Sequence, residues 1–460
     1  MKRLSLLIAL IAFVTLALRA ETPNVYAIRG ARIVTAAGAT IDSGTIVIRR
    51  GLTDAVGAAV TPPPDAEVID GRGATVYPGL IDLGNTRAAD QPVPQPPQNA
   101  RTMAEIERWK RAQILKPQAR ASDAVKVDDV ELTRLASAGI TSVLAMPSGD
   151  VISGQSSLIN VVAPPDDPQI GNLADARRAP IVVKTPVALH VSFPNRPRAG
   201  GNVYPESLMG VIAFVRQAFL DAQHYAAEKQ DGARRLQASV ARPAQGLGRQ
   251  LPAEDPALEA MQPAIERRMP VAFEANEPRE ILRVLEMARE LKLDPIVTGA
   301  RNAEAVAADL NAQHVRVIFS LNFPQRSRTL APDADEPVRA LRARADAPKV
   351  PAALAGSGVA FGFSSAGLTD PKDFVRNAAK AVKAGLAPDA AIRALTIAAA
   401  TIAGVGDRLG TIEKGKIANL VVTDGDLFDD KTKVTRVFID GRTVSLEAAP
   451  AGRGRGRGGP

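Results

Sequence analysis

The sequence predicts an α/β protein whose central part is a (β/α)8 TIM-type barrel. From about residue 140 to residue 400, short apolar runs alternate with amphipathic segments, and the units repeat about every 20 to 24 residues. This is the rhythm of βα units, whose strands run parallel with right-handed crossovers. Segments of β type bracket this part at both ends. A chain of 460 residues can bury one barrel together with an accessory domain.

The first bracketing block lies before the barrel. We expect short strands at residues 27–34, 44–50 and 67–70, because glycine, proline and aspartate separate these apolar stretches. The second block lies near the other end of the chain. There the turn at 410–416 leads into expected strands at 418–422 and 434–439.

The elements of the central part follow from hydrophobic periodicity. Continuous apolar runs between turn residues indicate buried strands, and a spacing of three to four residues indicates helices. The helix at 389–400 follows Pro388, a residue favoured in the first turn. The expected strands are 140–146, 270–275, 295–298, 315–321 and 358–364, and the expected helices are 278–291, 303–310, 373–384 and 389–400.

Residues 88–122 interrupt this rhythm. The segment contains a proline-rich run at 91–97 and a helical stretch at 103–114 that includes Trp109, the single tryptophan. Long insertions after a barrel strand either cover the mouth of the barrel or lie on the surface. The sequence leaves both interpretations open.

The N-terminus has the features of a secretory signal peptide. Lys2 and Arg3 precede an apolar run over residues 4–18. A membrane anchor is the alternative, but a span needs about 20 apolar residues. We therefore expect residues 1–20 to be cleaved, a periplasmic or secreted location and no membrane span afterwards. The chain has no cysteine, which is compatible with an oxidising compartment and excludes a cysteine-based zinc site.

The formal net charge of +8 is concentrated at the chain ends. Lys2, Arg3 and Arg19 fall in the expected signal peptide, and Arg453, Arg455 and Arg457 fall in the tail at 447–460. We expect a disordered Gly/Arg tail and no nucleic-acid partner. Contact with RNA or an anionic surface through this tail is the alternative.

Two motifs carry a resemblance to a known family. Residues 77–87 read YPGLIDLGNTR, and residues 410–422 contain the pattern Gly-x-Ile-x-x-Gly-Lys-x-Ala-x-Leu-Val-Val. Both resemble the amidohydrolase superfamily. In that family the first motif continues with x-His-x-His, and Gly84 and Thr86 stand at the histidine positions here. The resemblance implies that residues 21–77 and 405–446 combine into a small β-sandwich beside a barrel at 78–404.

The other metal-ligand positions implied by the resemblance are also substituted. Glu274 stands in place of the fifth-strand histidine, and Ser365 in place of the eighth-strand aspartate, while the sixth-strand segment 296–301 has no histidine. We therefore expect no cofactor and no tightly bound metal. A weakly held divalent cation at Asp82 and Glu274 stays open. We favour an ion pair between Glu274 and Arg301, which would replace the metal charge.

The three histidines offer little to a metal site. Residues 208–219 have helical periodicity, which places His224 on a helix. His314 precedes an apolar run and so lies at the amino-terminal end of a strand, whereas barrel chemistry occurs at the other end. His190 is the only histidine expected near a strand end, and we interpret it as a packed or surface residue.

Further motifs at 149–155, 204–210 and 320–324 are similar to exported bacterial amidohydrolase-like proteins. Some of these relatives lack the metal histidines and occur beside, or fused to, a second amidohydrolase module. The resemblance thus implies a non-catalytic protein that binds a small molecule or pairs with an active paralogous subunit. The alternative is a hydrolase of non-peptide C–N bonds with a reorganised site, built from barrel-mouth candidates Asp82, Glu274, Arg301, Asn322 and Ser365.

Overall fold

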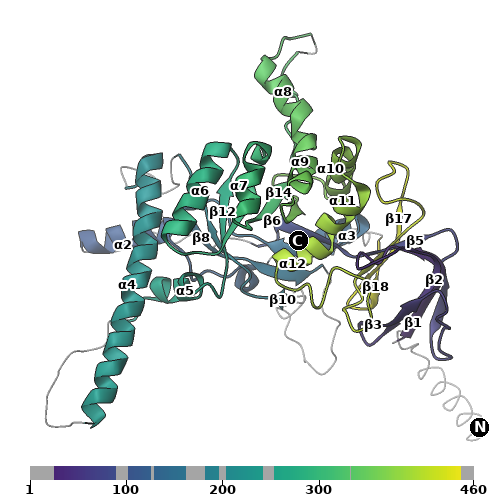
Figure 1. Cartoon of the computed structure of the whole chain (residues 1–460), viewed down its shortest axis with the longest axis horizontal. Coiled ribbons are helices and arrows are strands. Elements are labelled where there is room, and N and C mark those ends of the chain that lie inside the picture. Colours follow the sequence, from purple (N-terminus) through teal and green to yellow (C-terminus); the bar gives the residue numbers. More distant parts are fainter. Residues whose placement is uncertain are drawn as a thin grey trace, which may run out of the picture.

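The computed structural model describes residues 25–89, 102–125, 129–161, 182–195, 204–241, 253–331 and 333–446. The predicted signal peptide at 1–20, the proline-rich run at 91–97 and the Gly/Arg tail at 447–460 lie outside these residues. The described part is a mixed α/β protein, in which helices surround the central strands and a further sheet lies to one side (Figure 1). No helix of the described part is both long and apolar enough to cross a membrane.

The two β blocks predicted at the chain ends form one sheet. Its strand order is β18-β17-β16-β5-β1-β2-β3, with β4 beside β1. Strand β16 pairs antiparallel with β5, with Leu420 opposite Pro78, and this pairing joins the two ends of the chain. The strands are β1 Val25–Ile33, β2 Ile41–Arg49, β3 Leu52–Gly57, β4 Glu67–Asp70, β5 Thr75–Pro78, β16 Leu420–Thr423, β17 Val434–Ile439 and β18 Arg442–Val444.

The central strands form two sheets, of order β10-β9-β7-β6 and β15-β14-β13-β12-β11-β8. Strands β11 to β15 run parallel, as the βα rhythm predicts. The strands are β6 Leu80–Asn85, β7 Ile140–Ala145, β8 Ile152–Gln155, β9 Ser157–Asn160, β10 Val182–Lys184, β11 Leu189–Val191, β12 Val271–Ala275, β13 Pro295–Gly299, β14 Arg316–Ser320 and β15 Phe361–Ser364.

Side-chain hydrogen bonds connect β6 with β15, the edge strands of the two central sheets. The Ser364 hydroxyl donates to the carbonyl oxygen of Gly84 at 3.3 Å. The backbone N–H of Ser365 donates to Asp82 Oδ1 at 2.8 Å. These bonds bring the carboxyl ends of β6 and β15 together, close to the ends of the parallel strands.

Buried side chains of the helices pack against the central sheets. In α6, Pro278–Glu290, the buried residues Ile281, Val284, Leu285 and Ala288 recur every three to four positions and form one apolar stripe. The remaining helices of the body are α3 Asp129–Ser137, α4 Leu208–Ala241, α5 Pro256–Ile265, α7 Ala307–Ala312, α8 Val338–Asp346, α9 Val350–Gly356, α10 Lys372–Lys383, α11 Pro388–Leu395 and α12 Ile397–Ile402.

The prediction of one helix over 389–400 was wrong, because the chain breaks at Thr396. This residue has φ −131° and ψ −96° and separates α11 from α12. Its hydroxyl donates to the carbonyl oxygen of Ile392 at 2.6 Å, a local bond that competes with regular helix geometry. The backbone of Gly410 also packs against Ile397, where a Cβ on the glycine would lie 2.7 Å from Ile397 Cα.

The described part of the insertion packs against the body. Helix α2, Met103–Ile114, begins at Thr102 with a capping box and contacts α4 through Arg111 and Asp221 at 3.6 Å. Beyond it the chain pairs with β8, with Leu115 opposite Ile152. Neither cavity at the strand ends is lined by residues 102–125. These residues therefore fit the surface-insertion interpretation, and the proline-rich run at 91–97 lies outside the described residues.

Candidate functional site

Two adjoining cavities lie at the carboxyl ends of the central strands. The larger has a volume of about 210 Å³ and is lined by residues that end or follow β6, β7, β11, β12, β13, β14 and β15. The smaller has a volume of about 100 Å³. Thr86 and Gly367 line both, so the cavities share a wall. Because parallel strands deliver their carboxyl ends to one face, this is where chemistry or binding is expected.

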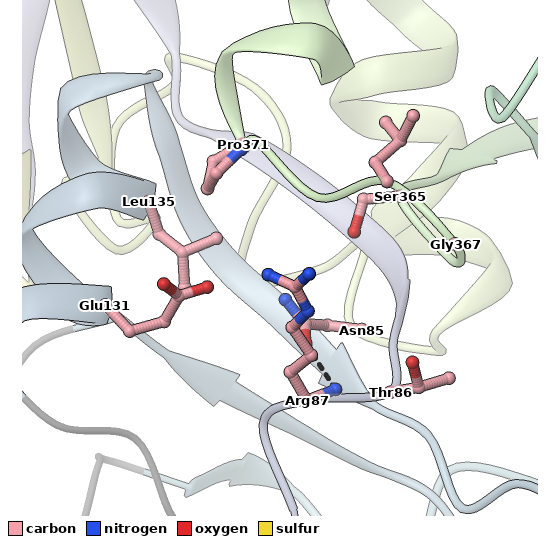
Figure 2. A pocket seen from close by; sticks show the side chains of 9 residues that line it. Asn85, Thr86, Arg87, Glu131, Leu135, Ser365, Gly367 and Pro371 are labelled. Carbon is pink, nitrogen blue, oxygen red and sulfur yellow. Dashed lines mark hydrogen bonds between the residues drawn. The ribbon is translucent and has the colours of Figure 1, made fainter. Parts of the chain in front are cut away.

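The turn after β6 shapes the smaller cavity. Figure 2 shows the Arg87 side chain extending from this turn between Glu131 and Ser365. The Asn85 side-chain oxygen accepts hydrogen bonds from the N–H groups of Arg87 and Ala88, at 2.9 and 3.0 Å. The Arg87 guanidinium donates to the carbonyl oxygen of Thr369 at 3.1 Å. The turn is thus held by its own side chains.

The first substituted ligand position, Gly84, is closed by packing. A Cβ added to Gly84 would lie 2.0 Å from the Ser364 hydroxyl oxygen and 2.9 Å from Ser364 Cβ. That hydroxyl is engaged, since it donates to the carbonyl oxygen of Gly84 and accepts from the N–H of Ala366 at 3.0 Å. The space that a side chain at position 84 would need is therefore occupied by β15.

Asp82 lies beneath this contact and is completely buried. One carboxylate oxygen accepts from the N–H groups of Gly84 and Ser365, at 3.0 and 2.8 Å, and the other accepts from the Ser365 hydroxyl at 2.5 Å. Burial raises the pKa of Asp82, and the hydrogen bonds from Ser365 and Gly84 oppose this shift. The carboxylate is saturated by protein donors, so its evident role is to join β6 to β15.

The larger cavity holds polar groups from successive strands. Glu274 on β12 is directly opposite Thr298 on β13, so both side chains point to the same face. Although Glu274 is exposed as a residue, the protein around its carboxyl group partly desolvates it and raises its pKa, and the charge of Arg301 opposes this shift. Asn322, after β14, lines the same cavity.

His190 also lines the larger cavity. Its residue exposure is only 5%, and its Nε2 has no hydrogen-bond partner within the described part of the chain. Burial lowers the pKa of His190 to about 3, so the imidazole is neutral near neutral pH. The sequence placed His190 near a strand end but left open whether it is packed or at the surface, and it gave no sign of an unsatisfied nitrogen. His224 lies on α4 and His314 just before β14, as predicted.

The predicted ion pair between Glu274 and Arg301 is not formed as a direct contact within 4.0 Å. The reason lies in the end of β13. Gly299 and Ala300 have φ +89° and +53°, and these left-handed conformations turn the chain before Arg301. Thr298 therefore occupies the position beside Glu274. Both charged side chains still line the larger cavity.

The five predicted mouth residues separate into three places. Glu274, Arg301 and Asn322 share the larger cavity. Ser365 lines the smaller cavity, and Asp82 lies under it without lining either. The open expectation of a cation held by Asp82 and Glu274 thus has no support in this geometry. Among the described residues, no three histidine, aspartate or glutamate side chains come together in a group able to hold a metal ion.

Comparisons with known proteins agree with this architecture. Residues 257–444 match the amidohydrolase family. The amidohydrolase tasK of Hapsidospora irregularis is 25% identical over 409 residues, which cover 86% of this chain but only 39% of that protein. The crystal structure of an amidohydrolase from Thermotoga maritima superposes with a TM-score of 0.71 at 22% identity, covering 91% of this chain and 99% of the other.

A prolidase complexed with N-methylphosphonate-L-proline superposes with a TM-score of 0.53 at 19% identity, covering 91% of this chain and 99% of that one. The match to the family includes the motif at 410–422. The chain is thus similar to the amidohydrolase family in sequence over residues 257–444 and in fold over most of its length. Members of that family usually use a metal, and the donor set found at these strand ends does not fit one.

Proposed function

We propose that this protein is a non-catalytic member of the superfamily that binds a small molecule in the larger cavity. The observation that carries the proposal is the contact at Gly84, where Ser364 occupies the space of the first ligand side chain. In the accompanying architecture, the two central sheets close into a TIM-type barrel and the terminal sheet forms the β-sandwich. The contact of β6 with β15 supports this closure.

The residue at the eighth-strand position supports the absence of the family reaction. In the mechanism that the resemblance implies, an aspartate there moves a proton to the leaving nitrogen. Ser365 stands there instead, and its hydroxyl donates a hydrogen bond to Asp82. A serine without a neighbouring histidine or lysine is not a base near neutral pH. We expect no turnover of dihydroorotate-, imidazolone- or dipeptide-type substrates.

The test combines elemental analysis with activity assays on the mature protein. Protein produced in metal-supplemented medium is expected to contain less than stoichiometric zinc and to show no turnover above a blank with added Zn²⁺, Mn²⁺ or Mg²⁺. One tightly bound transition metal per chain, together with metal-dependent turnover, would overturn the proposal.

A hydrolase of non-peptide C–N bonds is the second candidate. It is favoured by Glu274, a carboxyl group with a raised pKa inside a cavity, which is a feature of general acids and bases. This candidate predicts turnover by the isolated protein that disappears in Glu274→Gln. If the activity came from a contaminant, the Glu274→Gln substitution would leave turnover unchanged.

We also propose that the protein is exported and works beside an active paralogous amidohydrolase. The charged and apolar pattern of residues 1–18 supports export, and the predicted absence of the family reaction supports a partner role. N-terminal sequencing of periplasmic protein tests the first point, with a new terminus near residue 21 expected. Co-purification with an amidohydrolase encoded nearby tests the second.

A further inference from the structure

The larger cavity contains opposite charges that do not neutralise each other directly. Glu274 and Arg301 both line it, yet no contact within 4.0 Å joins them in the described structure. Both residues are exposed overall, so their charged groups can meet a ligand that enters the cavity. A gap between opposite charges in one cavity is therefore complementary to a molecule that carries both signs.

Two residues that line this cavity also carry buried polar atoms without partners. His190 Nε2 and Asn276 Oδ1 are buried and have no hydrogen-bond partner among the described residues. An unpaired buried polar atom is unfavourable, and such atoms are rare in folded proteins. Asn276 follows β12, the strand that carries Glu274. The acceptor oxygens of Glu274 and Asn276 therefore come from neighbouring positions of the chain.

We propose that the larger cavity binds a small zwitterion, with its cationic group at Glu274 and Asn276, its anionic group at Arg301 and a polar atom at His190 Nε2. This inference rests on the proposed ligand-binding function. An ammonium group has three donors and no acceptor, which suits a carboxylate and an amide oxygen. A guanidinium group matches the geometry of a carboxylate.

The size of the cavity and its charge balance limit the class of ligand that it can bind. A volume of about 210 Å³ corresponds to roughly seven water molecules, which is the scale of a free amino acid. A ligand with only a negative charge would lie close to Glu274 and be repelled by it. A neutral ligand would exclude water from both charges without pairing either.

The test measures binding of the common L-amino acids by calorimetry in metal-free buffer, and then the N-acetyl and amide derivatives of the amino acid that binds best. Acetylation removes the positive charge, and amidation removes the negative one. Each derivative is expected to bind at least about tenfold more weakly, because it loses charged hydrogen bonds that the parent amino acid makes.

Variants assign the two ends of the ligand. In Arg301→Gln the amide derivative should bind as well as the parent amino acid, and in Glu274→Gln the N-acetyl derivative should do so. His190→Gln should weaken all compounds alike. Exposed residues of α6 provide charge-matched controls, Arg279→Gln and Glu286→Gln, which should bind as the wild type does. Thermal unfolding of each variant verifies that it is folded.

The outcomes separate this inference from the function on which it rests. If the wild type binds both derivatives as tightly as the parent amino acid, or binds none of the amino acids, the proposal of a zwitterionic ligand is wrong. Metal-free binding of a singly charged or neutral compound would also overturn that proposal while leaving ligand binding intact. Turnover that requires an added metal would instead overturn the proposed function.

Discussion

The strand ends on the two sides of the mouth are built in opposite ways. Where β6 meets β15, Asp82, Ser364 and Ser365 have their hydrogen bonds supplied by the protein. Where β11, β12 and β13 end, His190 and Asn276 keep unpaired atoms and Glu274 lacks a direct ionic partner in the described structure. Saturation indicates a structural joint, and unsatisfied groups around a cavity indicate a binding site.

The largest effect is expected from Asp82→Ala. The substitution leaves the N–H groups of Gly84 and Ser365 and the Ser365 hydroxyl without an acceptor in a buried region. Each unsatisfied donor costs about 1–3 kcal/mol, so the free energy of unfolding should fall by about 3 kcal/mol or more. Urea unfolding measures this fall. A change below about 1 kcal/mol would mean that the joint is not structural.

The second prediction tests the closed ligand position. Gly84→Ala should lower the free energy of unfolding by about 1–3 kcal/mol, because its Cβ would overlap the Ser364 hydroxyl. Combining it with Ser364→Gly should recover part of the loss. Gly38→Ala is the matched control, since a Cβ there would meet nothing within 4 Å. Equal stability of the two alanine variants would show that position 84 is open.

The sequence predicted the parallel strands beside the larger cavity well, because apolar runs such as 270–275 and 315–321 stand between clear turn residues. It missed β8 and β9, where buried Ser153 and Ser157, and Ser156 between the two strands, interrupt the apolar pattern. Three of the five residues that it predicted at the mouth, Glu274, Arg301 and Asn322, line the larger cavity. The contact of Ser364 with Gly84 was not predictable, since it depends on the distance between strands far apart in the chain. An unpaired nitrogen on His190 likewise depends on neighbours that periodicity does not reveal.

The third prediction concerns His190, whose neutral imidazole lies beside the larger cavity. The pKa of His190 is about 3 in the fold and 6.5 without it, so the unfolded chain binds an extra proton between these values. The contribution of His190 to stability is therefore present above pH 6.5 and is lost as the pH falls toward 3. The slope approaches about 1.4 kcal/mol per pH unit.

The measurement compares urea unfolding of the wild type and His190→Gln from pH 7 to pH 4. The wild type should lose stability more steeply than the variant, which has no proton to bind at position 190. Subtracting the two curves removes the contributions of Asp82 and Glu274, whose raised pKa values act in the opposite direction. Parallel curves would show that the imidazole is accessible to water and not enclosed.

The smallest effect concerns Ser365, which belongs to the saturated side by one bond and to the smaller cavity by position. Ser365→Ala removes the hydroxyl donor of Asp82 Oδ2 but keeps both backbone donors to Oδ1. The expected loss of stability is about 1 kcal/mol, and ligand binding in the larger cavity should not change. Ser43→Ala, an exposed position on β2, is the control for the same change of side chain.

Because Asp82→Ala already removes the acceptor, Ser365→Ala should cost almost nothing in that background. A full additional loss in the double variant would show that Ser365 acts independently of Asp82, and the joint between β6 and β15 would then have to be explained by Ser364 alone.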